Sequence, residues 1–397
     1  MRFLCASDLH LGRSSSVPSN PKGLDLSAAG ALMRLADKAN RENADWLLLA
    51  GDICDKGENE YAAQLMLQKA IDRMSSNIRI AMISGNHDED SLERICGRLA
   101  KNYPDRVYFL NGKMDIGEGL SLLGYPYNSV DPEGVKQRLL KECDSSAIVL
   151  FHGDHRSAAG KYGGLTDDER RELATRSYFT VCGHNHYPEE AERGFINCGS
   201  PQALDAYDGG GSEKWHGAWM TENGEKTRFV PISNVCYVTV DVDIKDEPFD
   251  AFEEAEEAVP EGLSEFYLVT DVRFTGWADD LKKTFVSRSS SLDQLPNHFN
   301  GLNTLVRSVE NLCLPKPEPG DYSPVGVLWS LITDRDLPEG FASREDLLME
   351  ADKLIDEMTG AVLKEYEKEF SPEEKRELVR EAAVGLLQSL IIEEGKK

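Results

Sequence analysis

Five short polar motifs, each directly after an apolar run, contain the residues that could do chemistry. They are Asp8-Leu9-His10, Gly51-Asp52-Ile53-Cys54-Asp55, Gly85-Asn86-His87-Asp88, His152 and Gly183-His184-Asn185-His186. In an open α/β sheet, ligands collect outside the carboxyl ends of the strands, so five strand ends can converge on one crevice. Side chains two apart in an extended segment point the same way, so Asp8 with His10, and His184 with His186, should each direct two groups to one place.

The donors in these motifs are carboxylates, imidazoles and one amide oxygen, without a thiolate. This set suits manganese, iron or zinc, and it does not suit calcium, copper or an iron–sulfur cluster. Six or seven ligands are too many for one tetrahedral ion, so two cations that share a carboxylate are the simplest arrangement. We expect Asp52 to be the shared ligand. The glycines before Asp52, Asn86 and His184 should let the chain turn sharply beside the cluster.

Each motif also has a structural interpretation. One Asp-x-His pair, or one histidine after a strand such as His152, is more often structural than a ligand. The metal site is favoured because five of the eight histidines lie in these motifs. Asp55 and Asp88 are candidates for supporting the ligands from behind. His155 is a candidate for the same role or for a substrate contact, with an exposed side chain as the alternative, and His216 and His298 are interpreted as structural.

Composition and charge limit the classes of function that the chain could have. The chain has 397 residues, of which 40% are hydrophobic and 29% charged. It contains no apolar run of membrane-spanning length and no apolar export signal after Met1, so we expect a cytoplasmic protein without a membrane partner. Eight cysteines without a C-x-x-C pair are expected to be reduced core thiols. The net charge of −26 disfavours binding to a nucleic-acid backbone, although much of the acid is local to stretches such as 253–261.

Apolar runs alternate with helix-like stretches from residue 2 to about 232, which predicts an α/β sandwich in a first domain at 1–232. Strands are expected at 3–7, 46–50, 78–84, 107–110, 120–124, 147–151, 178–182 and 195–198. A hairpin at 217–220 and 227–231 should turn at Asn223-Gly224.

The remainder divides into three parts. Residues 233–310 predict a small α+β domain, with strands at 235–242 and 266–274, an acidic helix at 249–258 and a helix from 278. Residues 311–322 contain a run rich in proline and are interpreted as a linker. Residues 323–397 predict a helical region, with capped helices at 344–369 and 372–394. Each helix has an apolar stripe, which is typical of a partner-binding surface or of packing against the protein itself.

In their order and context, the five motifs resemble the calcineurin-like metallophosphoesterase superfamily over roughly residues 1–232. The resemblance implies an αββα sandwich and two divalent cations, with manganese expected and iron, zinc or magnesium as alternatives. It implies that His87 is a catalytic residue and not a ligand. It assigns one cation to Asp8, His10, Asp52 and His186, and the other to Asp52, Asn86, His152 and His184.

A finer resemblance is to the DNA-repair nuclease branch of this superfamily, the SbcD-type subunits. It rests on residues 3–12, 197–202 and 217–219, and on the layout of sandwich, small α+β capping domain, linker and helical C-terminal tail. Asp55 departs from the histidine that archaeal and eukaryotic relatives tend to have. The resemblance implies a two-fold homodimer, DNA as substrate, and an SbcC-like SMC-type ATPase bound through the C-terminal helices.

We therefore expect a metal-dependent phosphodiesterase that acts on DNA as an exonuclease or endonuclease. A metal-activated water would attack in line, and His87 would stabilise the transition state or protonate the leaving oxygen. The first alternative is a phosphoesterase for a nucleotide or another small phosphate, which the acidic charge favours. The second is a scaffold without catalysis, which the complete set of ligands disfavours.

Overall fold

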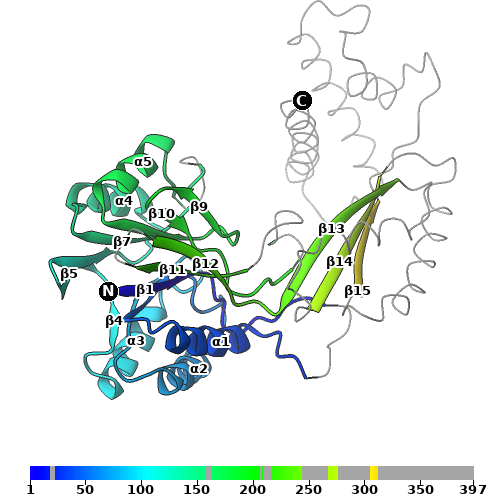
Figure 1. Ribbon diagram of the computed structural model, residues 1–397, viewed down its shortest axis with the longest axis horizontal. Helices are drawn as coiled ribbons and strands as arrows, with labels where there is room; N and C mark the ends of the chain where they lie inside the picture. Colours follow the sequence, from blue (N-terminus) through cyan, green and yellow to red (C-terminus); the bar gives the residue numbers. More distant parts are fainter. Residues whose placement is uncertain are drawn as a thin grey trace, which may run out of the picture. The chain divides into compact units, whose positions relative to one another are not determined.

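The computed structural model describes residues 1–17, 23–157, 163–205, 208, 216–222, 224, 226–243, 267–275 and 305–311 (Figure 1). The chain divides into one unit of Met1–Thr275 with Lys282–Leu312 and another of Gly276–Leu281 with Cys313–Lys397. All described residues belong to the first unit. The expected helices at 249–258 and from 278, the linker beyond residue 311 and the helical region 323–397 lie outside the described residues.

The first large sheet has the strand order β12-β11-β1-β2-β3-β4. Strands β1 to β4 run parallel, and β11 pairs antiparallel with both β1 and β12. Their bounds are Arg2–Ala6 for β1, Trp46–Ala50 for β2, Arg79–Ile83 for β3, Val107–Phe109 for β4, Gly217–Glu222 for β11 and Lys226–Pro231 for β12. All six were expected from the sequence, with ends that differ by at most two residues.

The second large sheet has the order β5-β6-β7-β8-β10-β9, with parallel pairing from β6 to β10 and antiparallel edges. Its strands are β5 (Gly112–Gly117), β6 (Leu120–Gly124), β7 (Ala147–His152), β8 (Phe179–Gly183), β9 (Glu189–Glu192) and β10 (Phe195–Asn197). The sequence predicted the four inner strands and missed both edges. An edge strand lacks a second partner and is polar, so its apolar pattern is weak.

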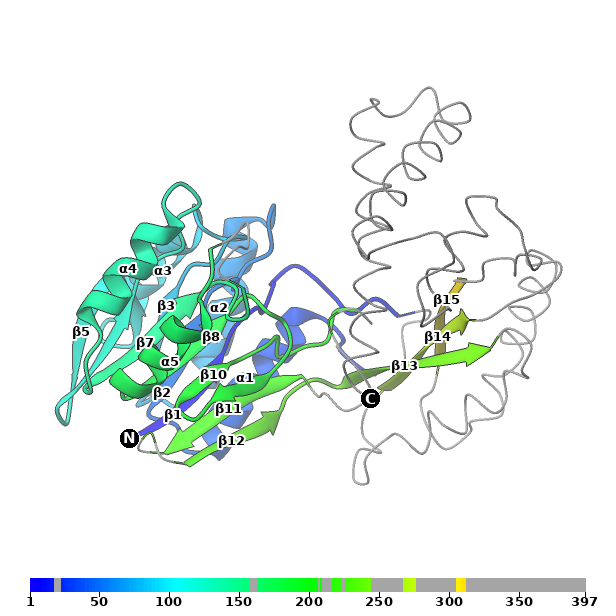
Figure 2. The same ribbon diagram turned by 90° about the horizontal axis from the view of Figure 1, so that it is seen from above.

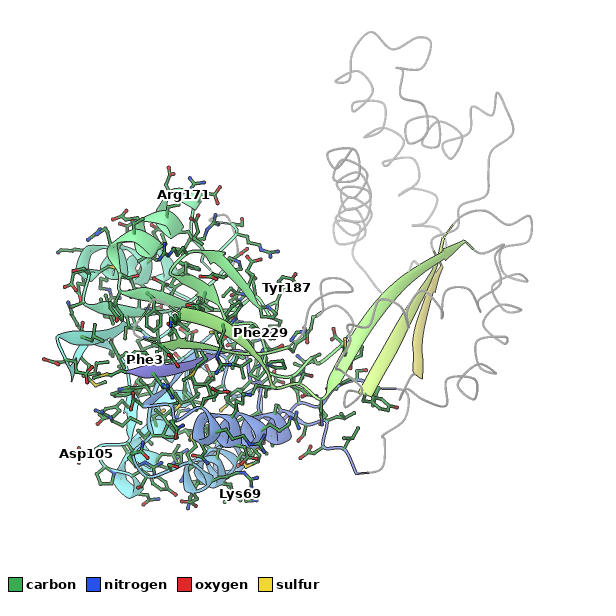
Figure 3. The ribbon with its side chains drawn as sticks, viewed as in Figure 1. Phe3, Lys69, Asp105, Arg171, Tyr187 and Phe229 are labelled. Atoms are coloured by element: carbon green, nitrogen blue, oxygen red, sulfur yellow. The ribbon has the colours of Figure 1, made fainter. Side chains whose placement is uncertain are left out.

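Alternation along the strands builds the layers between and outside the two sheets. On β1, Phe3 and Cys5 belong to the apolar cluster that also holds Phe179 and Val181 of β8, whereas Leu4 lies in the cluster on the opposite face. The Phe3 and Phe179 rings meet edge to face with centroids 5.4 Å apart. Figure 3 labels Phe3 on β1 within this sandwich.

Helices cover the two outer faces, as Figure 1 and the turned view in Figure 2 show. Residues of α1 (Ala28–Arg41), α2 (Glu60–Arg73) and α3 (Leu92–Asn102) pack on the first sheet. Residues of α4 (Pro132–Glu142) and α5 (Asp167–Arg176) pack on the second. This is the αββα sandwich that the sequence predicted. None of the helices in the described ranges has the length and hydropathy that crossing a membrane requires.

A third, smaller sheet follows in the chain. Its strands β13 (Val235–Asp243), β14 (Tyr267–Thr275) and β15 (Leu305–Asn311) are all parallel. The first two were expected and β15 was not. The first residues of β13 and β14 join an apolar cluster with the sandwich, in which Val235 and Tyr237 pack with Leu26 and Ala203.

All seven cysteines in the described residues are free and buried, as the sequence predicted. They are Cys5, Cys54, Cys96, Cys143, Cys182, Cys198 and Cys236.

Candidate metal centre

The polar motifs sit where strands of both large sheets end. Asp8 follows β1, Asp52 follows β2, Asn86 follows β3, His152 ends β7 and His184 follows β8. Hydrogen bonds join the ends across the two sheets: His152 Nδ1 lies 2.9 Å from the Ala50 carbonyl oxygen, and the His184 N–H donates to Asp8 at 3.1 Å. The convergence expected from the sequence is therefore present.

The prediction that the backbone is extended at Asp8, His10 and His184 is wrong. Asp8, His10 and Asp52 have φ of 49°, 49° and 51°, and His184 has 100°, so these residues are left-handed and not extended. Non-glycine residues adopt this conformation at a cost, and it clusters at functional sites. Asp8 and His10 face one place because both turn sharply.

Gly51 and Gly85 lie so close to candidate ligand side chains that a Cβ atom would not fit, which explains these glycines better than the turn of the chain alone. A Cβ at position 51 would lie 2.3 Å from the His152 ring, and one at position 85 would lie 2.2 Å from the Asp52 carboxylate. Any side chain at Gly51 or Gly85 would therefore push a candidate ligand out of place.

One group of candidate ligands comprises Asp8, His10 and His186, whose ligand atoms lie within 4.8 Å of one another. The two imidazole Nε2 atoms of His10 and His186 are only 3.0 Å apart. Asp52 Oδ2 lies 3.8 Å from His10 Nε2. These residues could hold one cation together.

A second group surrounds His152. Its Nε2 lies 3.5 Å from Asp52 Oδ2 and 3.1 Å from Asn86 Oδ1. The same amide oxygen lies 3.0 Å from His184 Nδ1. Asp52 thus stands between the two groups, and all seven expected ligands are brought to one place. Two adjacent cations that share Asp52 fit this arrangement.

The outer nitrogens of three imidazoles are fixed by acceptors. Nδ1 of His10 donates to Asp55 Oδ1 at 3.1 Å, Nδ1 of His186 to Asp208 Oδ1 at 2.6 Å, and Nδ1 of His152 to a carbonyl at 2.9 Å. A hydrogen bond from one ring nitrogen leaves the other with its lone pair for a metal. Two such lone pairs at 3.0 Å repel each other unless a cation lies between them, so His10 and His186 fit a metal centre.

The electrostatics also favour positive charge in the crevice. Burial alone would lower the pKa of His152, but the charges of Asp52 and Asp8 raise it to about 9. Burial would raise the pKa of Asp52, but His152 and His10 hold it below its usual range. Bound cations would supply this positive charge in place of protons.

Comparison with known proteins agrees with this site. Residues 1–188 match the family model described as calcineurin-like phosphoesterase. This part of the chain is similar to the calcineurin-like phosphoesterase family. The seven converging side chains all lie within this matched range and are candidate ligands for two metals.

One relative is the uncharacterized metallophosphoesterase YhaO of Bacillus subtilis (strain 168), 34% identical over 94 residues. That match covers 22% of this chain and 23% of the relative, so the chain matches about a quarter of the relative's length. Among solved structures, TT1561 of Thermus thermophilus has a TM-score of 0.40 at 12% identity, covering 58% of this chain and 98% of that one. A dimetal phosphatase from Danio rerio has 0.35 at 10%, covering 55% and 91%. At these scores the likeness bears on neither substrate nor reaction.

Within the matched range, Asp55 connects two histidines. Its Oδ1 lies 3.1 Å from His10 Nδ1 and 3.1 Å from His87 Nδ1. Burial would raise the pKa of Asp55, but the hydrogen bond from His10 and the charges of both rings lower it. The side chain of His87 is 33% exposed, and its backbone N–H donates to Asp52. His10, Asp55 and His87 could also hold a cation as a trio, which is an alternative to a catalytic role for His87.

Asp88 connects two loops that carry candidate ligands. One carboxylate oxygen accepts the backbone N–H groups of Ile53 and Cys54 at 2.7 and 3.0 Å, and the other accepts that of Gly85 at 2.7 Å. Burial and the nearby Asp52 raise the pKa of Asp88 to about 7. The expected supporting position of Asp88 behind the ligands is present, with contacts to the loops and not to the imidazoles.

His155 is buried, at 1% exposure, so the alternative of an exposed side chain is wrong. Its Nδ1 accepts from Asn185 at 2.8 Å, and its Nε2 donates to Glu189 at 2.6 Å. Asn185 lies between the candidate ligands His184 and His186, so His155 supports their loop.

Two further features complete the surroundings of the site. His216, interpreted as structural, is buried with Nδ1 2.8 Å from Ser200 Oγ. Sequence reasoning missed Asp208, the acceptor for His186. It lies beyond the last motif, and no local pattern distinguishes it from other acidic residues.

Proposed function

We propose that this phosphoesterase is a two-metal phosphodiesterase that hydrolyses DNA, as the exonuclease or endonuclease subunit of a DNA-repair complex. The observation that carries the two-metal part is the position of the Asp52 carboxylate, 3.8 Å from His10 Nε2 on one side and 3.5 Å from His152 Nε2 on the other. One cation would bind Asp8, His10, Asp52 and His186, and the other Asp52, Asn86, His152 and His184. Manganese is the proposed metal, with iron, zinc or magnesium as alternatives.

The residues of the chain have separate roles in this proposal. When bound, two cations make a water more acidic and neutralise charge on the phosphate. His87 touches the substrate, and its exposure allows a phosphate to reach it. Because Nδ1 of His87 donates to Asp55, Nε2 is the nitrogen that faces the substrate. In the imidazolium form, which the Asp55 carboxylate stabilises, Nε2 also carries a proton and would donate it to the leaving oxygen or to the phosphate.

The DNA substrate is supported by the resemblance to the SbcD-type branch. In the structure, residues 197–202 and 217–219 each contact residues 3–12. β11, which contains residues 217–219, pairs with β1, and the Ser7 hydroxyl donates to the Gly199 carbonyl oxygen at 3.2 Å. Gln202 Nε2 donates to Ser15 Oγ at 2.7 Å in the loop that leaves β1. Gln202 also lies 3.2 Å from Asn234, just before β13.

A small phosphodiester is the second candidate substrate, and the net charge of −26 favours it, because a DNA backbone is repelled by an acidic surface. Mn²⁺-dependent hydrolysis of linear duplex DNA, bis(p-nitrophenyl) phosphate and p-nitrophenyl phosphate separates the candidates. Cleavage of DNA together with the diester supports the nuclease. Cleavage of the diester alone, or of the monoester in preference, would favour a small phosphate as the substrate in place of DNA. Hydrolysis of none of the three would favour a scaffold without catalysis.

We also propose that residues 323–397 bind an SbcC-like SMC-type ATPase, on the basis of the apolar stripes in their sequence. Truncation after residue 320 should leave a metal-loaded enzyme that still cleaves the small diester but no longer recovers the ATPase in a pull-down. Equal recovery by the full-length and truncated proteins, or a truncated form that does not fold, would contradict this partner site.

A further inference from the structure

Asp208 makes the shortest contact of any carboxylate to a candidate ligand imidazole in the described residues. Its Oδ1 accepts from His186 Nδ1 at 2.6 Å, and its side chain is 12% exposed. Its Oδ2 accepts the backbone N–H of Leu204 at 2.9 Å. Asp208 lies outside residues 1–188, the part of the chain that matches the phosphoesterase family model.

We infer that Asp208 is a positioning residue for the metal centre. It holds His186 in the tautomer whose Nε2 lone pair faces His10 Nε2, and it thereby increases the affinity for the cation that His186 and His10 would share. A carboxylate behind a ligand histidine fixes the ring and makes the coordinating nitrogen more basic. This inference rests on the proposed metal centre and not on DNA as the substrate.

Comparison of the three supported imidazoles explains why Asp208 should matter. His152 donates to a backbone carbonyl, whereas His10 and His186 each donate to a carboxylate. Of the two carboxylates, Asp55 is 26% exposed and lies 3.1 Å from His10. Asp208 is less exposed and closer to its histidine, so water screens its interaction less.

The loop that carries Asp208 is anchored by its other contacts. Leu204, whose N–H binds Asp208, accepts at its carbonyl from the Ser16 N–H at 2.7 Å and from the Tyr237 hydroxyl at 3.2 Å. Ser16 lies in the loop after β1, and Tyr237 lies on β13. Asp208 therefore reaches His186 from a segment held by both the sandwich and the third sheet.

Asp208→Asn separates positioning from simple loop support. Its amide oxygen can accept one of the two hydrogen bonds, but its NH₂ group cannot accept the other, and the negative charge is gone. Asp208→Glu keeps the charge and both acceptor oxygens. Asp205→Asn is the matched control. Asp205 accepts the Asp208 backbone N–H, so the same chemical change is made in the same loop while the hydrogen bond from His186 to Asp208 keeps both of its partners.

The experiment is Mn²⁺ titration of the full-length protein by calorimetry, in the absence of substrate, with electron paramagnetic resonance to follow the paired ions. Asp208→Asn should weaken one of the two sites by on the order of 10- to 100-fold, the usual effect of removing a partner behind a ligand. Asp208→Glu should recover most of the affinity, and Asp205→Asn should bind like the wild type. Thermal melting of the metal-free variants checks that each is folded.

Two results would overturn the role of Asp208. The first is wild-type affinity at both sites in Asp208→Asn. The second is an equal loss in Asp208→Asn and Asp205→Asn, which would make the effect a general property of the loop. A wild-type protein that binds no Mn²⁺ would instead overturn the proposed metal centre itself, and this inference with it.

Discussion

Replacing Asp55 with asparagine should weaken two parts of the site at once. One carboxylate oxygen accepts from the ligand His10 and from the proposed catalytic residue His87, each at 3.1 Å. The amide oxygen of the introduced asparagine would accept the same hydrogen bonds without the negative charge. We therefore expect weaker metal binding through His10 and slower hydrolysis through His87.

The magnitude follows from the loss of charge assistance. A hydrogen bond to a charged group contributes about 1.5–3 kcal/mol and a neutral one about 1 kcal/mol. Because Asp55 is 26% exposed, we place the charged hydrogen bond in the lower half of its range, at about 2 kcal/mol, so that the loss is about 1 kcal/mol per contact. This corresponds to about fivefold in rate. Removing the imidazole in His87→Ala should cost on the order of 10²–10⁴ in rate while both cations stay bound.

A double-mutant cycle tests the connection between the two residues. The turnover number for bis(p-nitrophenyl) phosphate is measured at saturating Mn²⁺ in the wild type, Asp55→Asn, His87→Ala and the double variant. Asp55→Asn should slow the wild-type enzyme about fivefold and the His87→Ala enzyme not at all, since its catalytic partner is already gone. Asp37→Asn is the control, because Asp37 pairs with Arg73 on the outer helices.

Two outcomes would refute this reasoning. If Asp55→Asn slows the His87→Ala enzyme as much as the wild type, Asp55 acts through the metal centre alone. If His87→Ala loses metal in proportion to activity, His87 is a ligand, as the trio of His10, Asp55 and His87 allows.

Three other perturbations have defined outcomes. Asp52→Asn should lose activity and at least one cation, measured by metal analysis, because a neutral amide cannot balance two cations that shared a carboxylate. Asp88→Ala should lower the free energy of unfolding in urea by at least about 3 kcal/mol, since three backbone N–H groups lose their buried acceptor. The pKa of Glu189 is lowered from 4.5 to about 2, mainly by the hydrogen bond from His155. Arg156 lowers this pKa further, and burial acts in the opposite direction. A folded-state pKa below the unfolded value stabilises the protein above the unfolded pKa, so Glu189→Gln should be less stable than wild type at neutral pH, and the difference should shrink as the pH falls below about 4.5.

Each of these expectations can fail clearly. Normal turnover with full metal occupancy in Asp52→Asn would show that Asp52 is not a ligand shared by two cations. Wild-type stability of Asp88→Ala would mean that the two loops do not depend on its carboxylate. For Glu189, the matched control is the exposed neighbour Glu190→Gln, and a stability difference that stays constant with pH would show that the charge of Glu189 is not involved.

The inner strands and the ligands could be predicted because their signals are local. β2 reads Trp-Leu-Leu-Leu-Ala and is buried along its whole length, so the apolar run and the following Gly-Asp mark both the strand and the turn beside the site. The acidic edge strand β9 has no such signal, because Glu-Glu-Ala-Glu has a low strand propensity and is extended only through its pairing with β10.

The supporting residues could be predicted only where they lie next to a ligand in the sequence. Asp88 was a candidate because it follows Asn86 in the same motif, yet its contacts reach back 35 positions to Ile53. Asp208 reaches His186 across 22 positions from a loop outside the matched domain, and nothing in its neighbours announces that contact. The ligand types are thus specified at the strand ends, whereas the direction of their lone pairs is specified by carboxylates elsewhere in the chain. For this reason, a family match over residues 1–188 contains all seven candidate ligands but only part of the machinery proposed to tune their metal affinity.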